Sequence, residues 1–438
     1  MTRPPGAAGR ALAGLIAILL VLWPRGASAT QSAPGAGRVP AISSAACAPL
    51  GPPSGAIVRV STVDQLQAAI SGLAANTTVL VADGTYHLTQ TLNISAAASH
   101  VTIRGASGNR DAVVLTGGGM TPTGGNLSHI FQLFGATDVT IADMTLEDVY
   151  YHLVQVHGEQ GATRPSLYNL HLLDAGEQFV KVSTDGTSGL YSDDGLVACS
   201  TIEYTSYPPS DYTNGVDVLA GAGWVIRDNV FRNIRSPDQS LAGPAVLMWK
   251  NTLDSLVERN LFIECDRAVA LGLSAPDSNS RGGEKVYDHQ GGIVRNNLIY
   301  RAGPGDVGIT LNYARAAEVY NNTVILNGTF PWTIEYRFTP TTADIRYNLS
   351  DGPVLMRDGA SGTVIGNLAS TQPSWFFNAA AGNLHLAAAA SAAIGHAASL
   401  AAVPDDYDGQ LRPIGPAPDI GADEYSPLTP RQHLPLIQ

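Results

Sequence analysis

The stretch LVERNLFI, residues 256–263, consists of two short apolar segments separated by a polar pair that ends in asparagine. The same arrangement recurs in WVIRDNVF (224–231), IVRNNLIY (293–300), VYNNTVIL (319–326) and IRYNLS (345–350). Its asparagines are residues 229, 260, 297, 322 and 348, followed by Asn367, at intervals of 31, 37, 25, 26 and 19 residues. Repeats of this size indicate an architecture in which each repeat stacks on its neighbours.

The residue types of the repeat decide which architecture fits. Short β-branched segments separated by Gly, Asn and Asp exclude helical repeats, and one turn per repeat excludes four-stranded propeller blades. The pattern predicts an all-β chain, a single-stranded right-handed parallel β-helix (solenoid) with one rung per repeat. Asparagine suits the turn because it tolerates left-handed backbone and can pair with the asparagine one rung away. VDQLQAAISGL (63–73) has the periodicity of a short amphipathic helix and is expected to cap the N-terminal end.

The two ends of the chain differ from the repeats. Arg3 and Arg10 precede an apolar run (11–23) and a small-residue site (27–29), which is the pattern of a cleaved export signal. We expect a signal peptide at 1–29, a Pro/Gly/Ala-rich linker at 30–56, the β-helix at 57–404 and a C-terminal capping segment and tail at 405–438. The mature chain is expected to be a monomer, secreted or held at the cell surface, and not inserted in the membrane.

Charge and cysteine content exclude several classes of partner. Removal of the signal removes three arginines and moves the net charge from −12 to about −15, which argues against nucleic acid and anionic lipid. Cys47, Cys199 and Cys265 are an odd set without metal-like spacing, so we expect no disulfide framework and no zinc site. Cys199 and Cys265 fall in apolar strand segments and are expected to be small buried residues.

The start of the repeat region resembles a known group of proteins. The helix, TTVLVADGTYHL (77–88), TLNI (91–94) and VTIRGAS (101–107) are similar to the opening of exported right-handed parallel β-helix proteins. That group includes the pectate-lyase-like and chondroitinase-B-like polysaccharide lyases. The resemblance covers roughly residues 56–425 and implies a β-helix fold and a carbohydrate-active function.

The ending DYDGQLRPIGPAPDIGADEY (406–425) resembles a C-terminal segment of such proteins. Its Asp406, Asp408 and Gly409 are similar to part of a calcium loop, so Ca²⁺ is the one metal that the sequence suggests, although the full acidic series is missing. The alternative is a capping turn that Arg412 holds together with an acidic residue, Asp419 or Glu424. The second interpretation is favoured.

The third strand of each rung predicts a candidate site. The aligned segments are HLVQVH (152–157), QFVKVS (178–183), NGVDVL (214–219), AVLMWK (245–250), AVALGL (268–273), VGITLN (307–312), WTIEYR (332–337) and PVLMRD (353–358). Their third position is always aliphatic: Val154, Val180, Val216, Leu247, Ala270, Ile309, Ile334 and Leu355. Side chains alternate along a strand, so the third position is expected inside and the fourth and sixth outside. The outward set then includes Lys181, Asp217, His157, Lys250, Asn312, Glu335 and Arg337.

This outward face is expected to bind a linear polymer. Two of the chain's three lysines lie on it, and the long segments 184–213 and 274–292 leave the chain at its edge. Long loops on a rigid scaffold commonly form the walls of a binding site. Lys181, Asp217, His157, Asn312, Glu335 and Arg337 are the predicted substrate-binding residues, and the loop with Asp288 and His289 is expected to overhang them. The alternative is an ordinary solvated sheet face.

A reaction can be assigned to this face. Cleavage of a uronate polymer by β-elimination needs a base for the proton at C5 and positive charge at the adjacent carboxylate. A lysine acts as that base only when a nearby cation lowers its pKa. Lys250 is the candidate base, His289 a second proton-transfer group, and Lys181 the residue that neutralises the carboxylate.

The stretch VLMWKNTLDSLVERNLF (246–262) is similar in layout to the catalytic stretch of chondroitinase-B-like lyases, with Lys250 at the position of their base. Where that pattern has an acidic pair that binds calcium, this chain has Gly243 and Ala245. Where it has an assisting arginine one rung on, this chain has Leu271-Gly272. The base is matched and its partners are not, so any metal would need other ligands.

Two other classes of function stay open. Inverting glycosidases need carboxyl groups roughly 6.5–9.5 Å apart. Asp217 and Glu335 are four rungs, about 19 Å, apart, whereas Glu335 and Asp358 lie on adjacent rungs. A surface adhesin or glycan-binding solenoid would use the same face without a base. The sequence favours a carbohydrate-active protein that cleaves an acidic polysaccharide by β-elimination.

Overall fold

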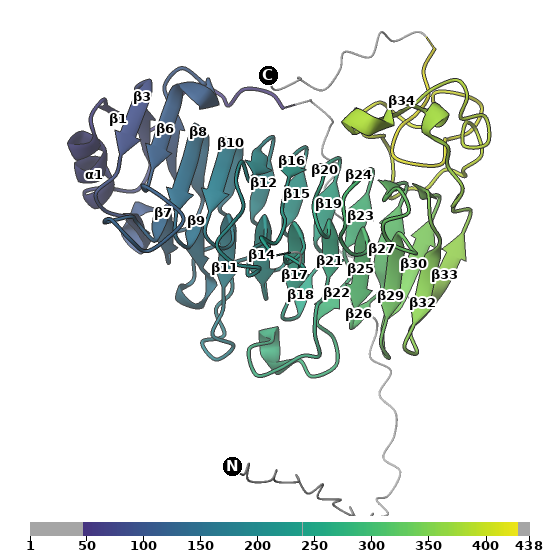
Figure 1. Ribbon diagram of the computed structural model, residues 1–438. Helices are drawn as coiled ribbons and strands as arrows, with labels where there is room; N and C mark the ends of the chain where they lie inside the picture. Colours follow the sequence, from purple (N-terminus) through teal and green to yellow (C-terminus); the bar gives the residue numbers. More distant parts are fainter. Residues whose placement is uncertain (1–46, 239, 428–438) are drawn as a thin grey trace, which may run out of the picture. The chain divides into compact units, whose positions relative to one another are not determined.

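The computed structural model describes residues 47–238 and 240–427, and its strands stack along one axis in three parallel ladders (Figure 1). Each complete rung contributes one strand to each ladder, for example β19, β20 and β21. The pairings within these ladders are parallel, as a β-helix requires. The predicted all-β, right-handed parallel β-helix is confirmed.

The larger sheet, called sheet A, contains the first two ladders, which the long strands β8 and β10 join near the N-terminal end. Its strands are β1 (Ala56–Val60), β2 (Thr77–Val81), β3 (Gly84–His87), β5 (Val101–Gly105), β6 (Val113–Thr116), β8 (Val139–Val149), β10 (Ser166–Ala175), β12 (Leu196–Ala198), β13 (Thr201–Glu203), β15 (Val225–Arg227), β16 (Val230–Arg232), β19 (Leu256–Glu258), β20 (Leu261–Ile263), β23 (Ile293–Arg295), β24 (Leu298–Tyr300), β27 (Ala317–Tyr320), β28 (Thr323–Ile325), β30 (Thr342–Arg346), β31 (Leu349–Ser350) and β33 (Ser361–Ile365).

The third ladder, called sheet B, carries the candidate site. Its strands are β4 (Leu92–Ser95), β7 (His129–Phe134), β9 (His152–His157), β11 (Val180–Ser183), β14 (Val216–Leu219), β17 (Val246–Trp249), β21 (Val269–Leu271), β25 (Ile309–Asn312), β29 (Ile334–Arg337) and β32 (Val354–Arg357). A small parallel sheet contains β18 (Thr252–Leu253), β22 (His289–Gln290) and β26 (Ala314–Arg315), and an antiparallel pair contains β34 (Phe376–Asn378) and β35 (Asn383–Leu386).

Helix α1 (Val63–Ser71) lies where the sequence predicts a cap. It begins after Thr62, whose side chain accepts a hydrogen bond from the backbone N–H of Gln65, as an N-cap does. The helix buries Leu66 and Ile70 in the core, next to β1 and β4. No helix in the described part of the chain is long and apolar enough to cross a membrane, and the expected signal peptide lies outside the described residues.

The predicted asparagine ladder is confirmed. The side-chain amide of each asparagine donates to the side-chain oxygen of the asparagine on the next rung at 2.8–3.0 Å, from Asn229 through Asn260, Asn297, Asn322 and Asn348 to Asn367. The same oxygens accept backbone N–H groups of the preceding rung, such as that of Asn229 at Asn260. The ladder therefore satisfies the buried backbone groups at each turn.

The expected reason for asparagine is only partly right. Left-handed backbone occurs at the residue before each ladder asparagine, for example at Arg259 (φ 51°) and Asn296 (φ 54°), and Gly366 takes this position before Asn367. The ladder asparagine is therefore selected for its amide pairing, and the turn conformation is taken by its neighbour.

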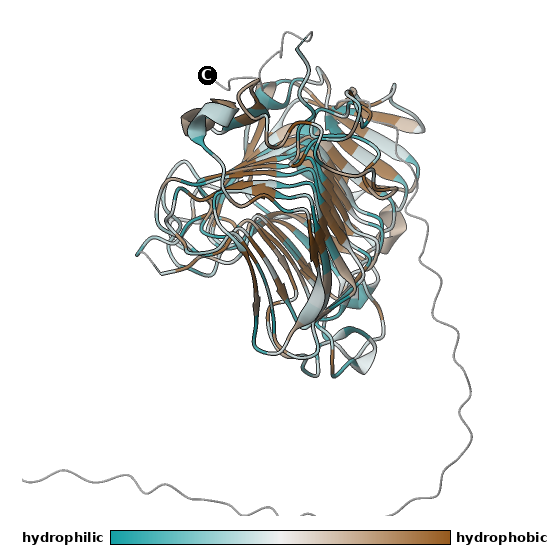
Figure 2. Cartoon of the chain, turned by 90° about the vertical axis from the view of Figure 1, so that its right-hand side faces the viewer, coloured by the Kyte–Doolittle hydropathy of each residue, from teal (hydrophilic) through white to brown (hydrophobic). Residues whose placement is uncertain are grey.

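The interior column of sheet B differs from the predicted one by one residue in three rungs. The paired residues are Val154, Val180, Val216, Val246, Val269, Ile309, Ile334 and Val354. Leu247, Ala270 and Leu355 instead pair with outward residues such as Asp217 and Glu335. In these three segments both sides of the strand are apolar, so alternation could not fix the register. Figure 2 shows the hydrophobic strand residues lying behind one another along the axis.

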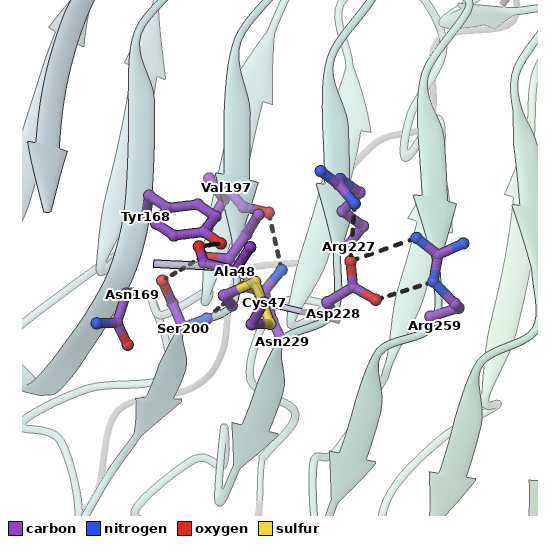
Figure 3. Close-up of a disulfide and its surroundings, with 12 residues drawn as sticks. Cys47, Ala48, Tyr168, Asn169, Val197, Ser200, Arg227, Asp228, Asn229 and Arg259 are labelled. Atoms are coloured by element: carbon purple, nitrogen blue, oxygen red, sulfur yellow. Dashed lines mark hydrogen bonds and ion pairs between the residues drawn. A yellow bond between two sulfur atoms is a disulfide. The ribbon is translucent and has the colours of Figure 1, made fainter. Parts of the chain in front are cut away.

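Cys47 and Cys199 form a disulfide, so the expectation that the chain has none is wrong (Figure 3). The two cysteines are separated by 152 residues, and an odd cysteine count gave no indication of their pairing. Cys199 is bonded as well as buried, whereas Cys265 is free and buried as expected.

The disulfide fixes a leading segment, residues 47–55, to sheet A. The hydroxyl of Tyr168 donates to the carbonyl of Ala48 at 2.5 Å (Figure 3), and the guanidinium of Arg104 donates to the carbonyl of Gly51 at 2.9 Å. Part of the expected linker is thus ordered against the β-helix.

The C-terminal part packs on the outside of sheet A. Leu261, Leu298, Ile325 and Leu349 share a second hydrophobic core with the segment's Phe376, Leu384, Leu386 and Ile420. The last strand paired with the β-helix ladders is β33, so the expected boundary at residue 404 falls inside this segment. Within it, Arg412 pairs with Glu424 at 2.6 Å and donates to the carbonyls of Asp419 and Gly421, which matches the predicted capping turn.

We expect Asn260→Ala to lower the free energy of unfolding by roughly 2–4 kcal/mol, because buried partners on both sides lose their hydrogen bonds. Chemical denaturation monitored by circular dichroism measures the change. Asn367→Ala, at the half-buried end of the ladder, is the matched control and should cost less. Equal losses for both variants would contradict a cooperative ladder.

The disulfide predicts a simple thiol count. Protein unfolded in guanidinium without reductant should react with one equivalent of Ellman's reagent, through Cys265, and with three after reduction. Reduction of the folded protein should also expose residues 47–55 to proteolysis, while the β-helix stays folded. Three thiols before reduction would refute the pairing.

Candidate functional site

The outer face of sheet B holds a continuous row of contacting side chains, called the Lys181–Lys250 row. The Lys181 ammonium pairs with Asp217 on the next rung. The other carboxylate oxygen of Asp217 accepts the indole N–H of Trp249 at 2.7 Å. The Nζ of Lys250 lies 4.3 Å from the centroid of the Trp249 ring. Four side chains from three rungs thus contact one another in order.

Lys181 and Asp217 form a buried ion pair. Lys181 is 8 % and Asp217 1 % exposed. Burial by itself would lower the pKa of Lys181, but the carboxylate of Asp217 and the hydroxyl of Tyr212 outweigh it and raise that pKa above its usual value. Lys181 is therefore held as a cation, which suits anion neutralisation and excludes it as a base.

Lys250 is not in the outward strand position that the alignment gave it. Trp249 pairs with Leu219 and takes that position, and Lys250 follows the strand in left-handed conformation (φ 62°). Its ammonium still returns to the edge of the face, where it pairs with Asp277 at 2.7 Å. The Lys250 side chain is 8 % exposed and that of Asp277 48 % exposed.

The two polar residues of the second loop lie elsewhere than expected. Asp288 is fully buried and accepts backbone N–H groups of Lys250, Leu273 and Ser274 at 2.8–3.2 Å, so it fixes the base of the loop.

His289 belongs to β22 and is fully buried, with its Nδ1 2.6 Å from the hydroxyl of Thr252. Burial lowers the pKa of His289 to about 3. The structure therefore does not bring His289 to the outer face of sheet B, and the expectation that it overhangs this face is wrong.

Only the first part of the expected loop 184–213 is a loop, because the segment also contains β12 and β13 of the next rung, and this first part contacts the second loop. Gly186 of the first loop approaches the backbone of Asn279 in the second so closely that a Cβ atom would have no room. Arg281 pairs with Asp193 at 2.6 Å and lies 4.3 Å from the Tyr191 ring. Both loops lie at the end of the sheet B strands, below β11 and β17 in Figure 1.

At the N-terminal side of the row, His157 lies in the outward position predicted for it and pairs with Ser183. Its ring stacks on Phe134 with centroids 4.3 Å apart, and its Nδ1 is 2.8 Å from Glu159. The carboxylate of Glu159 also accepts the Ser183 hydroxyl at 2.8 Å.

The C-terminal half brings Asn312, Glu335 and Arg337 together. Asn312 pairs with Arg337 on the next strand, and Thr310, beside Glu335, donates to the carboxylate of Glu335 at 3.2 Å. Arg337 lies 4.0 Å from Glu335 and 2.7 Å from Asp358. A guanidinium therefore lies between the two carboxylates that a hydrolase would use.

Several side chains at this face were not identified from sequence. Trp332 donates to Glu335 at 2.9 Å and lies under Arg357, which pairs with the same carboxylate at 3.0 Å. Trp249 and Asp277 complete the contacts of Lys250. Trp249 stands directly before Lys250 in the sequence, and a register shifted by one residue would have identified it.

A pair of histidines lies beside the row. The rings of His129 and His152 are 5.3 Å apart. Nδ1 of His152 lies 3.2 Å from the carbonyl of Gln178, so this nitrogen carries the proton. Burial, the neighbouring His129 and Lys181 lower the pKa of His152 to about 3, and burial with His157 lowers that of His129 to about 4. Both rings are neutral at physiological pH.

The cations of this face have anionic partners. The pairs are Lys181–Asp217, Lys250–Asp277, Arg281–Asp193, Arg337–Asp358 and Arg357–Glu335. The face therefore carries charge without a net positive field.

Among the described residues, a group that could hold a metal ion lies in the C-terminal segment. Ligand atoms of His385, Asp408 and Asp423 lie within 4.8 Å of one another, with Nε2 of His385 3.1 Å from Asp408. A nitrogen among the ligands suits zinc or manganese better than calcium. Asp406, part of the suggested calcium loop, instead accepts the backbone N–H groups of Gln410 and Glu424.

The buried histidines predict loss of stability in acid. Their folded pKa values lie below the unfolded value of about 6.5, so the unfolded state binds more protons and stability falls as pH drops from about 6.5 toward 3. We expect His289→Gln to lose less melting temperature than the wild type between pH 7 and pH 4, measured by differential scanning fluorimetry. Burial raises the pKa of Asp406 to about 7 and that of Asp419 to about 6, which favours the folded state as the pH falls. This contribution is the same in the wild type and in His289→Gln. Parallel pH profiles would contradict the prediction.

No family model and no curated protein sequence matches this chain. Solved structures similar to it include pectate lyase Pel9A, with 15 % identity, a TM-score of 0.49 and coverage of 82 % of this chain and 90 % of that chain. PfbA, a surface adhesin of Streptococcus pneumoniae, has 13 % identity, a TM-score of 0.46 and coverage of 69 % and 87 %. The polygalacturonase from Erwinia carotovora has 12 % identity, a TM-score of 0.41 and coverage of 75 % and 98 %. The pairing of the chain's own strands, rather than these likenesses, makes it a right-handed parallel β-helix protein.

Proposed function

We propose that this protein is an exported carbohydrate-active β-helix protein that binds an acidic polysaccharide along the outer face of sheet B and cleaves it by β-elimination. The observation that carries the proposal is the Lys181–Lys250 row. It places two ammonium groups, a carboxylate and an indole ring on neighbouring rungs. Rungs about 4.8 Å apart offer repeated positions for a linear sugar chain, and loops form a wall along the face.

The two lysines take different roles in this proposal. Lys181 is held charged by buried Asp217, so it neutralises a substrate carboxylate. Lys250 is the base, and it becomes available when its loop partner Asp277 moves away. Asp277 is the partner that can move because its side chain is half exposed and lies on a loop, whereas Asp217 is buried in the sheet.

The elimination balances within the substrate. The neutral amine of Lys250 takes the proton from C5, and the electron pair of that bond forms a C4–C5 double bond. The C4–O glycosidic bond breaks, and its electron pair leaves with the oxygen, which then takes a proton. Neutralisation of the adjacent carboxylate by Lys181 stabilises the carbanion character that develops at C5.

The disulfide supports export. Disulfides persist in oxidising compartments and are rare in the cytosol, so Cys47–Cys199 fits a secreted or surface-held protein. The signal peptide proposed for residues 1–29 would deliver the chain there.

A non-catalytic glycan-binding or adhesin function is the second candidate. The pairing of each cation on this face favours it, because a lysine that keeps its carboxylate partner cannot take a proton. Inverting hydrolysis is weaker, since Arg337 lies between Glu335 and Asp358.

We expect Lys250→Ala to lower kcat on uronate polymers about 10²–10⁴-fold, the usual cost of losing a positioned proton-transfer group. Asp277→Asn should raise kcat, because Lys250 loses the carboxylate partner that otherwise has to move away. The ultraviolet absorbance of the unsaturated product measures both.

Arg346→Ala is the matched control, since it removes a cation that pairs with Asp344 on β30 of sheet A, away from the row. Circular dichroism checks that each variant folds. Binding without unsaturated product would refute the lyase and support the adhesin alternative, and full activity of Lys250→Ala would refute its role as base.

A further inference from the structure

A second polar depression lies beside sheet B but outside the Lys181–Lys250 row. It has a volume of about 220 Å³ and is lined by Tyr204, Thr205, Ser206, Tyr207, Asn233 and Arg235. These residues follow β13 and β16, where the chain leaves sheet A for the third strand of the rung. None of them belongs to the face assigned to the polymer.

The walls of this depression are fixed by hydrogen bonds. The carboxylate of Asp174 accepts the backbone N–H of Thr205 at 2.8 Å and also the Thr205 hydroxyl. Tyr204 is buried, and its hydroxyl donates to the carbonyls of Ala175 and Glu177. The depression therefore exists before any ligand enters, which lowers the cost of binding.

Several groups around it have hydrogen-bonding capacity left. The Nε–H of Arg235 is buried and has no acceptor among the described residues. In the same part of the chain, no hydrogen bond uses the hydroxyl of Ser206 or the amide oxygen of Asn233, whose amide nitrogen donates to the carbonyl of Tyr204. The hydroxyl of Ser206 and the amide oxygen of Asn233 therefore have hydrogen-bonding capacity for a ligand.

Tyr207 provides an aromatic surface at the same place. It is 65 % exposed, more than any other aromatic residue in the described part of the chain. An exposed ring beside polar groups gains contact area when a ligand with an apolar face covers it.

The charge of the depression selects against acids. Arg235 pairs with Glu264, which also accepts the backbone N–H groups of Ala302 and Gly303. Asp174 adds a further carboxylate close by. A ligand carboxylate would meet negative charge here, whereas neutral hydroxyl groups can both donate and accept.

We propose that this depression is a second sugar-binding site, which takes one neutral sugar unit with its ring on Tyr207 and its hydroxyls on Ser206, Asn233 and Arg235. The site goes beyond the proposed lyase function and does not need it. The same loop carries Tyr212, whose ring lies 5.7 Å from the ammonium of Lys181. A polymer held on sheet B could thus place a neutral branch in the depression.

Saturation-transfer NMR on the full chain tests the proposal, with galactose, glucose, mannose and galacturonate as separate probes. A neutral sugar should bind with a Kd on the order of 1 mM, as expected for a single small unit. Tyr207→Ala should weaken that binding about tenfold or more. Tyr151→Ala, which removes another exposed tyrosine away from the depression, is the matched control and should leave it unchanged.

The possible results distinguish sugar binding in the depression from polymer binding at the Lys181–Lys250 row. Lys250→Ala should retain monosaccharide binding even if it abolishes cleavage of the polymer. The proposal is overturned if none of the three neutral sugars gives a signal that depends on Tyr207. It is also overturned if galacturonate binds in a Tyr207-dependent way more tightly than the neutral sugars, or if Tyr151→Ala weakens binding as much as Tyr207→Ala.

Discussion

From β15 onward, each rung of this β-helix has to turn between its first and second strands without leaving buried backbone groups unpaired, and the asparagine ladder meets this requirement there. Each ladder amide links two rungs and also satisfies backbone groups, as Asn260 does with Asn229, Asn297 and the carbonyl of Ile226. The turn has no room for insertions, because a longer loop would separate the amides. Insertions are therefore confined to the other turns of the rung.

This constraint explains where the molecule carries its other features. The long loops all leave at the edges of sheet B, so that sheet receives the walls of the candidate site. The residues before three of the ladder asparagines contact the C-terminal segment. Arg259 pairs with Asp405, and the amides of Asn296 and Asn321 donate to the carbonyls of Asp405 and Asp419. In these turns the asparagine binds the ladder, and the residue before it binds the C-terminal segment.

The sequence predicted the features that repeat and missed those that occur once. The ladder, the parallel strands and the helix over 63–71 each follow from local spacing or periodicity. The disulfide joins residues 152 positions apart, and no periodicity marks its partners. The register of AVLMWK failed for a physical reason. Leu247 is only 3 % exposed although it lies on the outer face, so both sides of this strand are buried and the inside–outside contrast disappears.

The burial that hid the register also limits what the site can do. A paired cation can meet a substrate carboxylate either by keeping its protein partner and sharing its charge, or by losing that partner. Loss of Lys181 would leave Asp217 buried and unpaired, which typically costs several kcal/mol, so Lys181 keeps Asp217 and shares its charge with the substrate. Asp277 can leave Lys250 for water at little cost, because its side chain is already half exposed. The position where a substrate can enter and the position of the candidate base are therefore the same, and the loop that carries Asp277 controls both.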